Sequence, residues 1–295
     1  MPKNDFTVLL DKREGTEVEG VSVGDAILRG KPFYMPGSTG LADSIDAVVN
    51  AGLIHVPTFG LIAGRAYADK EEEAWQHWHD SKAERITALD EKGILGEKGV
   101  VYVIDIQNGG LFVWNTDRIR EAVKGGSLVN GAIQLNQDEI NPLLNAIKKK
   151  DYIALKEIIY GIDVVFAGNY GEFTEASKAP DFLRGMNASY VVVRTAEEAR
   201  KLGSGLKDIS SQRKNPELII PSGGEEALKR MLDRAQEFGW KQFGAWNDGY
   251  QRHNLGRVAC LDDSNDGVYC GISLNASGRS VGVAPVALEV FYKKE

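Results

Sequence analysis

The segment LGRVACLDDSNDGVYCGISLNASGRSVGVAP, residues 255–285, holds both cysteines and many short polar residues, but no Lys, Glu, Gln, Met or Trp. The gap in these five types runs from Arg252 to Leu288. Together they make up about a fifth of the chain, so a window of this length should contain about seven of them. A solvated loop normally collects Lys and Glu first, so polarity alone does not explain their absence. The composition indicates that something other than folding selected these residues.

The totals of the chain are those of an ordinary globular protein. Its 295 residues are 43% hydrophobic and 26% charged, which allows a sizeable core in one large domain or two smaller ones. A net charge of −7 argues against general nucleic-acid binding, because phosphate contacts need clustered Lys and Arg. No apolar run is long enough to span a membrane, and the N-terminus lacks the apolar core of a signal peptide. We therefore expect a soluble protein, cytoplasmic or carried in a virus particle.

Apolar periodicity predicts a mixture of helices and strands over residues 1–239. The predicted strands cover residues 5–11, 99–107, 110–115, 163–169, 188–195 and 216–222. The predicted helices cover residues 40–52, 68–93, 116–126, 136–150, 152–161, 195–203 and 223–239. Capping boxes at Thr195 with Glu198, and at Ser222 with Glu225, open the last two of these helices.

The composition changes after Gly239. No further helix is evident, and Gly, Asn, Asp and Ser separate short apolar pieces before a final predicted strand at 286–294. We therefore divide the chain into a supporting part, residues 1–239, and a C-terminal part, residues 240–295. This division leaves open that the two parts share one continuous core.

The longest predicted helix contains His77-Trp78-His79. Two His separated by one residue share a metal ion when they lie on a strand, whereas on a helix they point apart. A catalytic metal would also need a third ligand. We therefore expect no metal here, and no nucleophile, base and orienting group assemble elsewhere. A soluble enzyme of unrecognised type with a site near His77 and His79 stays as the alternative function.

Residues 262–267 imitate the opening of a calcium loop, with oxygen-bearing side chains at positions one, three and five and glycine at position six. Position twelve is Ser273, where a bidentate Glu is required, and no helix frames the loop. We expect an Asx-rich turn, with calcium as the weaker alternative and no other cofactor. Cys260 and Cys270 belong to no C-x-x-C motif. Free thiols are favoured over a bridge in a chain without an export signal.

The five missing residue types share a property of the genetic code, since none is encoded by a codon ending in C or T. Every residue from Arg252 to Leu288 can be encoded by a codon ending in C or T. This pattern is expected when Asn codons have had their first two bases randomised. With Gly244-Ala-Trp246 before it and GRSVGVAP at 278–285, the segment resembles the variable region of proteins diversified by retroelements. The looser frame is similar to archaeal and uncultivated-lineage members.

The resemblance implies an α+β protein with a C-type lectin-like fold, elaborated by N-terminal helices and strands. It also implies that the strand at 286–294 lies beside the strand at 5–11. The fixed positions expected to be buried or in special turns are Trp246, Gly256, Leu261, Leu274, Val281, Val283 and Pro285. Most of the variable, ligand-binding positions are expected to cluster on one exposed surface. These positions are Asn247, Asp248, Tyr250, Arg252, His253, Asn254, Asp262, Asp263, Asn265, Asp266, Tyr269, Ser273, Asn275, Ser277 and Ser280.

The function implied is that of a receptor-like or adhesin-like binding protein. A surface of Tyr, Arg, His, Asn, Asp and Ser suits protein recognition. We expect an unknown protein or cell-surface ligand as partner, with no nucleic acid, no membrane span and no catalytic residues. A structural protein of a virus particle is the third alternative, after the enzyme.

Overall fold

The computed structural model describes residues 27–179, 182–183, 185–246, 254–263, 267–269 and 273–284. It also describes three short strands: β1 (Phe6–Leu9), β2 (Glu17–Val18) and β3 (Val21–Ser22).

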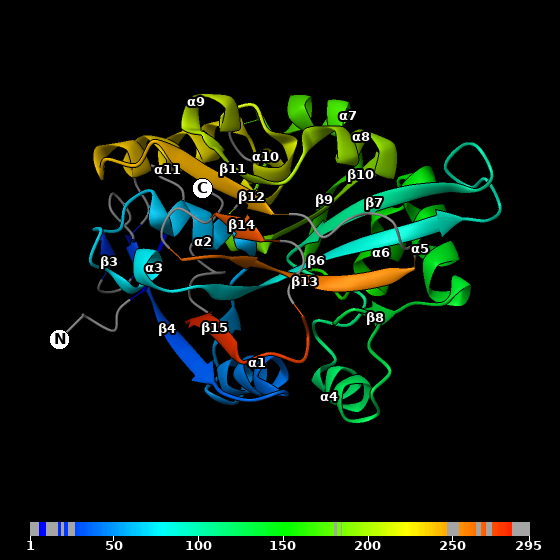
Figure 1. The fold of residues 1–295 in the computed structure, drawn as a ribbon, viewed down its shortest axis with the longest axis horizontal. Coiled ribbons are helices and arrows are strands. Elements are labelled where there is room, and N and C mark those ends of the chain that lie inside the picture. Colours follow the sequence, from blue (N-terminus) through cyan, green and yellow to red (C-terminus); the bar gives the residue numbers. More distant parts are fainter. Residues whose placement is uncertain are drawn as a thin grey trace.

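One large mixed sheet runs through the middle of the molecule (Figure 1) and contains thirteen of the described strands. Its strands are β1, β4 (Ile27–Met35), β5 (Ile54–His55), β6 (His79–Asp90), β7 (Val100–Gln107), β8 (Ile133–Gln134), β9 (Asp163–Asn169), β10 (Ala188–Thr195), β11 (Gly205–Asp208), β12 (Gln242–Trp246), β13 (Leu255–Leu261), β14 (Val268–Tyr269) and β15 (Gly278–Val283). Central to it is β6, which pairs antiparallel with β7 and β13 and through one parallel bridge with β15.

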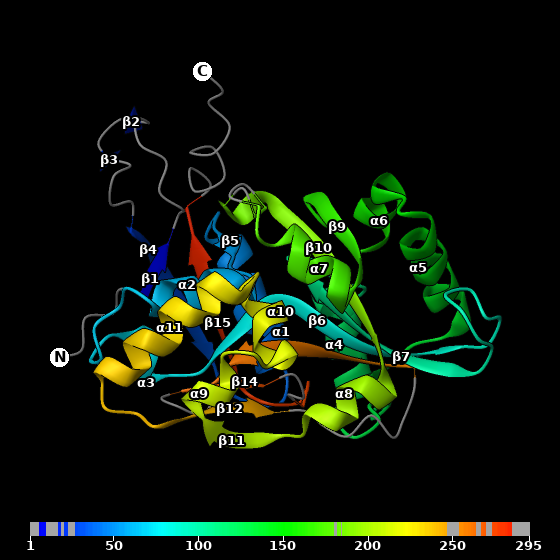
Figure 2. The same ribbon diagram turned by 90° about the horizontal axis from the view of Figure 1, so that it is seen from above.

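Helices cover both faces of the sheet, as Figures 1 and 2 show. One buried cluster joins the sheet to α2 (Thr58–Arg65), α3 (Glu73–Gln76), α7 (Tyr170–Ala176), α9 (Ile209–Gln212), α10 (Pro216–Ser222) and α11 (Glu225–Glu237). A second joins it to α1 (Gly40–Asn50), α4 (Thr116–Lys124), α5 (Gln137–Lys149) and α6 (Tyr152–Ile158). The short helix α8 (Ala196–Leu202) packs its alanines against β7. The result is a sheet with a hydrophobic core on each side.

Most of the predicted elements are confirmed. The predicted helices at 40–52, 116–126, 136–150, 152–161, 195–203 and 223–239 correspond to α1, α4, α5, α6, α8 and α11. The predicted strands at 99–107, 163–169 and 188–195 are β7, β9 and β10. The capping box of α8 is present, because Glu198 N–H donates to Thr195 Oγ1 at 3.1 Å while Glu198 accepts from Thr195 N–H at 2.8 Å. Local sequence signals were sufficient for these elements.

The helix predicted at 68–93 is wrong. Within this range only residues 73–76 are helical, and β6 begins at His79. Because β6 lies between other strands, most of its charged residues, among them Glu84 and Arg85, are buried. On a surface helix they would face the solvent. Glu84, for example, accepts backbone N–H groups from Leu111 at 2.7 Å and from Phe112 at 2.8 Å. The partners that make this strand possible come from distant parts of the chain.

Two predicted strands are also wrong. Residues 216–222 form α10, whose first turn is capped by Asn215, which accepts the Glu217 N–H at 3.0 Å. Residues 110–115 form a turn in which the N–H groups of Leu111 and Phe112 donate to Glu84. The hairpin partner of β7 is β6. The cap predicted at Ser222 is wrong as well. Ser222 Oγ donates to Leu218 O at 2.6 Å, and Gly224 is the N-cap of α11.

Strands from both sides of residue 239 share the one sheet. In it, β15 pairs with β4 over Gly278–Gly282, and β13 pairs with β6 from Leu255 to Leu261. The C-terminal part therefore adds strands to the supporting part. The strand predicted at 286–294 lies outside the described residues. Its expected neighbour is β1, which pairs with β4.

Candidate functional site

The candidate site is the C-terminal segment that holds the predicted variable positions. The structure places the side chains of Asn254, Asp262, Asp263, Ser273, Asn275, Ser277 and Ser280, and the backbone of Tyr269. Outside the described residues lie Asn247, Asp248, Tyr250, Arg252, His253, Asn265 and Asp266, together with the fixed position Pro285. For these the sequence expectation stays a prediction.

The segment Ser273–Ser277 leads from β14 into β15 and is held at both ends. Leu274 is fully buried in the core below α1 and α5, and its N–H donates to Gly131 O at 2.8 Å. Asn275 is exposed and accepts a hydrogen bond from Ser273 Oγ. Ser277 Oγ accepts the Gly37 N–H at 3.3 Å. An anchored backbone with an outward side chain at Asn275 is an arrangement in which that side chain can change without disturbing the core.

Ser280 is an exception to the prediction that most of the candidate positions lie on an exposed surface. Its side chain is fully buried, and its Oγ lies 2.8 Å from Ser44 Oγ on α1. On the neighbouring strand its backbone pairs with Asp80. Ser280 is therefore part of the contact between β15, β6 and α1, and a ligand at the surface does not reach it.

Asn254 is half-buried and also has a structural role. Its backbone is left-handed, with φ of 58°, a conformation that Asn tolerates better than most residues. Its Oδ1 accepts the Leu89 N–H at 3.0 Å, and its carbonyl accepts the Leu135 N–H at 2.7 Å. These bonds attach the start of β13 to β6 and to the end of β8.

The end of β13 turns at Asp262 and Asp263, both half-buried. Asp262 Oδ1 accepts the N–H of the next residue, Asp263, at 3.0 Å, and Asp262 N–H donates to Gly267 O at 2.6 Å. The buried guanidinium of Arg65 donates to Asp262 O. The turn is thus fastened to the end of α2.

The fixed positions agree with the expectation where they are described. Leu261, Leu274, Val281 and Val283 are buried. Gly256 packs against Phe112 so closely that a Cβ at this position would lie 2.4 Å from Phe112 Cε1. Trp246 is half-buried, so the expectation of burial holds for it only in part.

A patch of aromatic and charged side chains, which the sequence reasoning missed, lies beside this segment. It consists of Tyr34, Glu73, His77, Trp78 and Arg279, and we call it the Arg279 patch. The Arg279 guanidinium lies 5.0 Å from the ring centre of Tyr34 and donates to Glu73 Oε1 at 2.5 Å. Tyr34, 51% exposed, meets Trp78 edge to face at 6.5 Å. The motif 278–285 contains Arg279, but only the pairing of β15 with β4 brings it to Tyr34.

Two buried groups lie behind the Arg279 patch. Burial raises the pKa of Asp80 to about 7, although Asp80 Oδ2 accepts the Arg279 N–H at 2.8 Å. Burial lowers the pKa of His79 to about 4, against the opposing effect of Glu73. His79 is therefore neutral at pH 7, while Glu73 binds Arg279.

His77 and His79 do not lie on one helix, contrary to the prediction. His77 ends α3 and His79 begins β6. Their Nε2 atoms lie 3.6 and 3.7 Å from the two carboxylate oxygens of Glu73. Among the described residues, no group of three or more His, Cys, Asp or Glu side chains is placed to hold a metal ion.

Cys260 is buried in β13, and Cys270 lies outside the described residues, so the expectation of free thiols stays a prediction. None of the described helices is both long enough and apolar enough to cross a membrane.

Comparison with known proteins connects this architecture to one solved structure. No family model matches the chain, and no curated protein matches its sequence. The solved structure is described as "Accommodation of massive sequence variation in Nanoarchaeota by the C-type lectin fold". It aligns with a TM-score of 0.61 and 18% sequence identity, covering 87% of this chain and 98% of the other. At this identity the similarity establishes the fold, and the chain has a C-type lectin fold of the α+β class.

Proposed function

We propose that this is a ligand-binding protein in which exposed positions between residues 247 and 277 form a binding surface diversified by a retroelement. The rest of the chain serves as an invariant support. The single observation that carries the proposal is the gap in Lys, Glu, Gln, Met and Trp from Arg252 to Leu288. This gap coincides with β13, β14 and β15 of a C-type lectin fold.

The local geometry supports diversification at some positions of the segment. Randomised residues are tolerated where they do not carry the core, because a buried polar group without partners costs roughly 1–3 kcal/mol. Asn275 is exposed, while Asp263, Ser273 and Ser277 are half-buried at the surface. The backbone of the same segment is anchored through Leu274. Support also comes from the similar structure, which is described as accommodating massive sequence variation.

The Arg279 patch supports recognition of a macromolecule. Trp, Tyr and Arg dominate the energetics of protein interfaces, and Tyr34, Trp78 and Arg279 lie together here. Arg279 is only two residues from Ser277. We infer that the Arg279 patch is a constant part of the surface, and that the variable side chains beside it determine which protein or cell-surface ligand binds.

The genome of the source provides the decisive test. A near-copy of the DNA for residues 246–285 should lie near the gene, differing from it almost only at adenines and accompanied by a reverse transcriptase gene. If the complete genome holds no such copy, the diversification proposal is wrong.

A protein experiment tests the supporting role of the scaffold. Asn275→Tyr should change the free energy of unfolding by less than about 0.5 kcal/mol, as surface substitutions usually do. Ser280→Tyr should cost at least about 1–3 kcal/mol, because it overpacks a buried site. Equal costs at the two positions would contradict a division into variable and supporting residues.

A further inference from the structure

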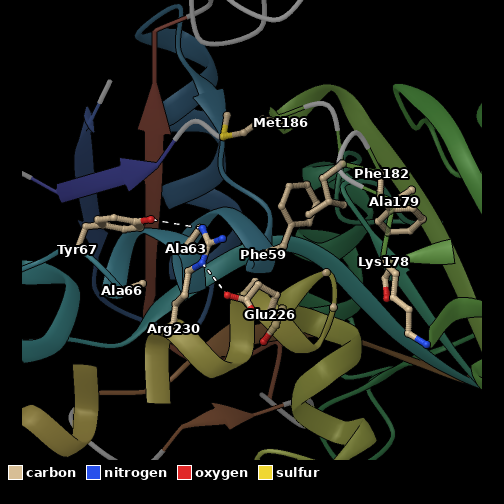
Figure 3. Close-up of a pocket in the computed structure, with 16 residues that line it drawn as sticks. Phe59, Ala63, Ala66, Tyr67, Lys178, Ala179, Phe182, Met186, Glu226 and Arg230 are labelled. Atoms are coloured by element: carbon tan, nitrogen blue, oxygen red, sulfur yellow. Dashed lines mark hydrogen bonds and ion pairs between the residues drawn. The ribbon is translucent and has the colours of Figure 1, made fainter. Parts of the chain in front are cut away.

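A cavity of about 260 Å³ lies between α2 and α11, on the side covered by the segment that follows α7 (Figure 3). Its lining residues come from α2 and the turn after it, from the segment after α7, and from the end of α10 through α11, and include Phe59, Ala63, Phe182, Glu226 and Arg230. None of these residues belongs to the Arg279 patch or to the C-terminal segment.

Small side chains create this space. Ala63 lies in α2, Ala66 follows its last residue, Ala227 lies in α11, and Ala179 lies in the segment after α7; all four line the cavity. A larger side chain at any of the four would reduce the cavity.

Aromatic side chains form a fixed apolar wall. Phe59 and Phe182 are at most 9% exposed, and both rings contact the buried ring of Tyr190, at 5.9 and 5.6 Å between centroids. Met186, 2% exposed, closes the same side. Tyr190 is fastened in turn, because its hydroxyl donates to Ile220 O at 2.6 Å. The wall is thus built before any ligand arrives, which reduces the entropy cost of binding.

The polar groups lie at the opening. Arg230 Nη1 lies 3.4 Å from the Tyr67 hydroxyl, and Arg230 Nε lies 3.3 Å from Glu226 Oε1, as Figure 3 shows. Both distances are long for hydrogen bonds, and Arg230 Nη2 donates to none of the described residues. Lys178, the other cation among the lining residues, forms an ion pair with Glu175 at 2.8 Å. Arg230 is therefore the group at this opening that can bind an anion.

We propose that this cavity binds a small aromatic compound that carries one carboxylate on a short chain. An apolar cavity of about 150 Å³ is sufficient to hold benzene, so 260 Å³ accommodates a phenyl ring with a few additional atoms. The ring lies against Phe59 and Phe182, and the carboxylate accepts hydrogen bonds from Arg230 at the opening. Arg230 suits this role because its planar fork matches a carboxylate.

The test uses 3-phenylpropionate and its neutral analogue 3-phenyl-1-propanol as probes, titrated calorimetrically into the full-length protein. The carboxylate should bind more tightly than the alcohol. Arg230→Gln should weaken binding of the carboxylate by about tenfold or more, as expected for a charge-assisted hydrogen bond, and leave the alcohol nearly unchanged. The matched control is Lys229→Gln, one residue earlier on α11 and outside the cavity, which should change neither.

Ala63→Phe fills the cavity and should abolish binding of both probes. Ala66→Phe gives a second filling variant in case the first fails to fold, which circular dichroism detects. Absence of binding to the unchanged protein overturns the proposal. So does binding that survives in a folded filling variant. If Arg230→Gln weakens the acid and the alcohol equally, the role of the carboxylate is wrong.

Discussion

Replacing Glu217 by Gln should lower the free energy of unfolding by about 3–5 kcal/mol, the usual result of removing one partner of a buried ion pair. Glu217 belongs to a closed ring of four charges that joins α10 to three strands. Arg85 donates to Asp105 Oδ1 and to Glu217 Oε2, both at 2.6 Å. Arg194 donates to Asp105 Oδ2 at 2.7 Å and to Glu217 Oε1. All four side chains are at most 4% exposed. The variant leaves two buried guanidinium groups with one carboxylate.

Chemical unfolding in urea at pH 7, followed by circular dichroism, measures this loss. The control is Glu175→Gln, which breaks an exposed ion pair with Lys178 and should cost less than about 1 kcal/mol. A loss below about 1 kcal/mol in Glu217→Gln, with an unchanged dependence on urea, would refute the reasoning.

The pH dependence provides a second check on Glu217. Burial alone would raise its pKa, but the charges of Arg194 and Arg85 outweigh burial and hold the pKa well below its ordinary value. A carboxyl group with a lowered pKa in the folded state stabilises the protein above the unfolded pKa of about 4.5 and loses this effect as the pH falls. The stability difference between the unchanged protein and Glu217→Gln should therefore narrow below about pH 4.5.

Three further outcomes are expected. Because burial raises the pKa of Asp80 to about 7, its protonated form stabilises the fold. The unfolding free energy should therefore fall as the pH rises from about 4 through 7, and Asp80→Asn should be more stable relative to the unchanged protein at pH 8 than at pH 5; a constant difference contradicts this. Leu274→Ala should cost about 2–5 kcal/mol in urea unfolding, whereas Asn275→Ala should cost under about 0.5 kcal/mol. Gly256→Ala should lower the free energy of unfolding by about 1–3 kcal/mol through overpacking, since the added Cβ meets Phe112, and should therefore lower the melting temperature. An unchanged melting temperature would contradict this, because it would mean that Phe112 moves aside at no cost.

The sequence determined the elements whose signals are local. α8 begins at a capping box that lies within four residues, and α5 has a capping box and a left-handed end at Lys150. A capping signal was also present at α10, where Asn215 precedes Pro216 in the first helical position, as helix starts prefer. The apolar run that follows predicts a strand, and this prediction is wrong because the residues form α10. Such errors are correctable from sequence, because the information lies within one turn.

Other features depended on neighbours far apart in the chain. β6 contains charged residues that favour helices, but it is a strand because β7 and β13 pair with it. Its buried carboxylate Glu84 accepts hydrogen bonds from the N–H groups of residues 111–113. No local pattern contains those partners. Propensity is weak beside such tertiary interactions, which is why the longest predicted helix was wrong.

The candidate site divides in the same way. Its composition, and so its place between Arg252 and Leu288, could be read from the sequence, as could the burial of Leu274 and Val281. Only the tertiary structure decided that Ser280 is buried beneath α1 and that Arg279 meets Tyr34. The physical reason is that exposure depends on what packs against a side chain. In this fold α1, β4 and β6, from the first ninety residues, cover or border the C-terminal strands, and β8 borders β13 from the middle of the chain.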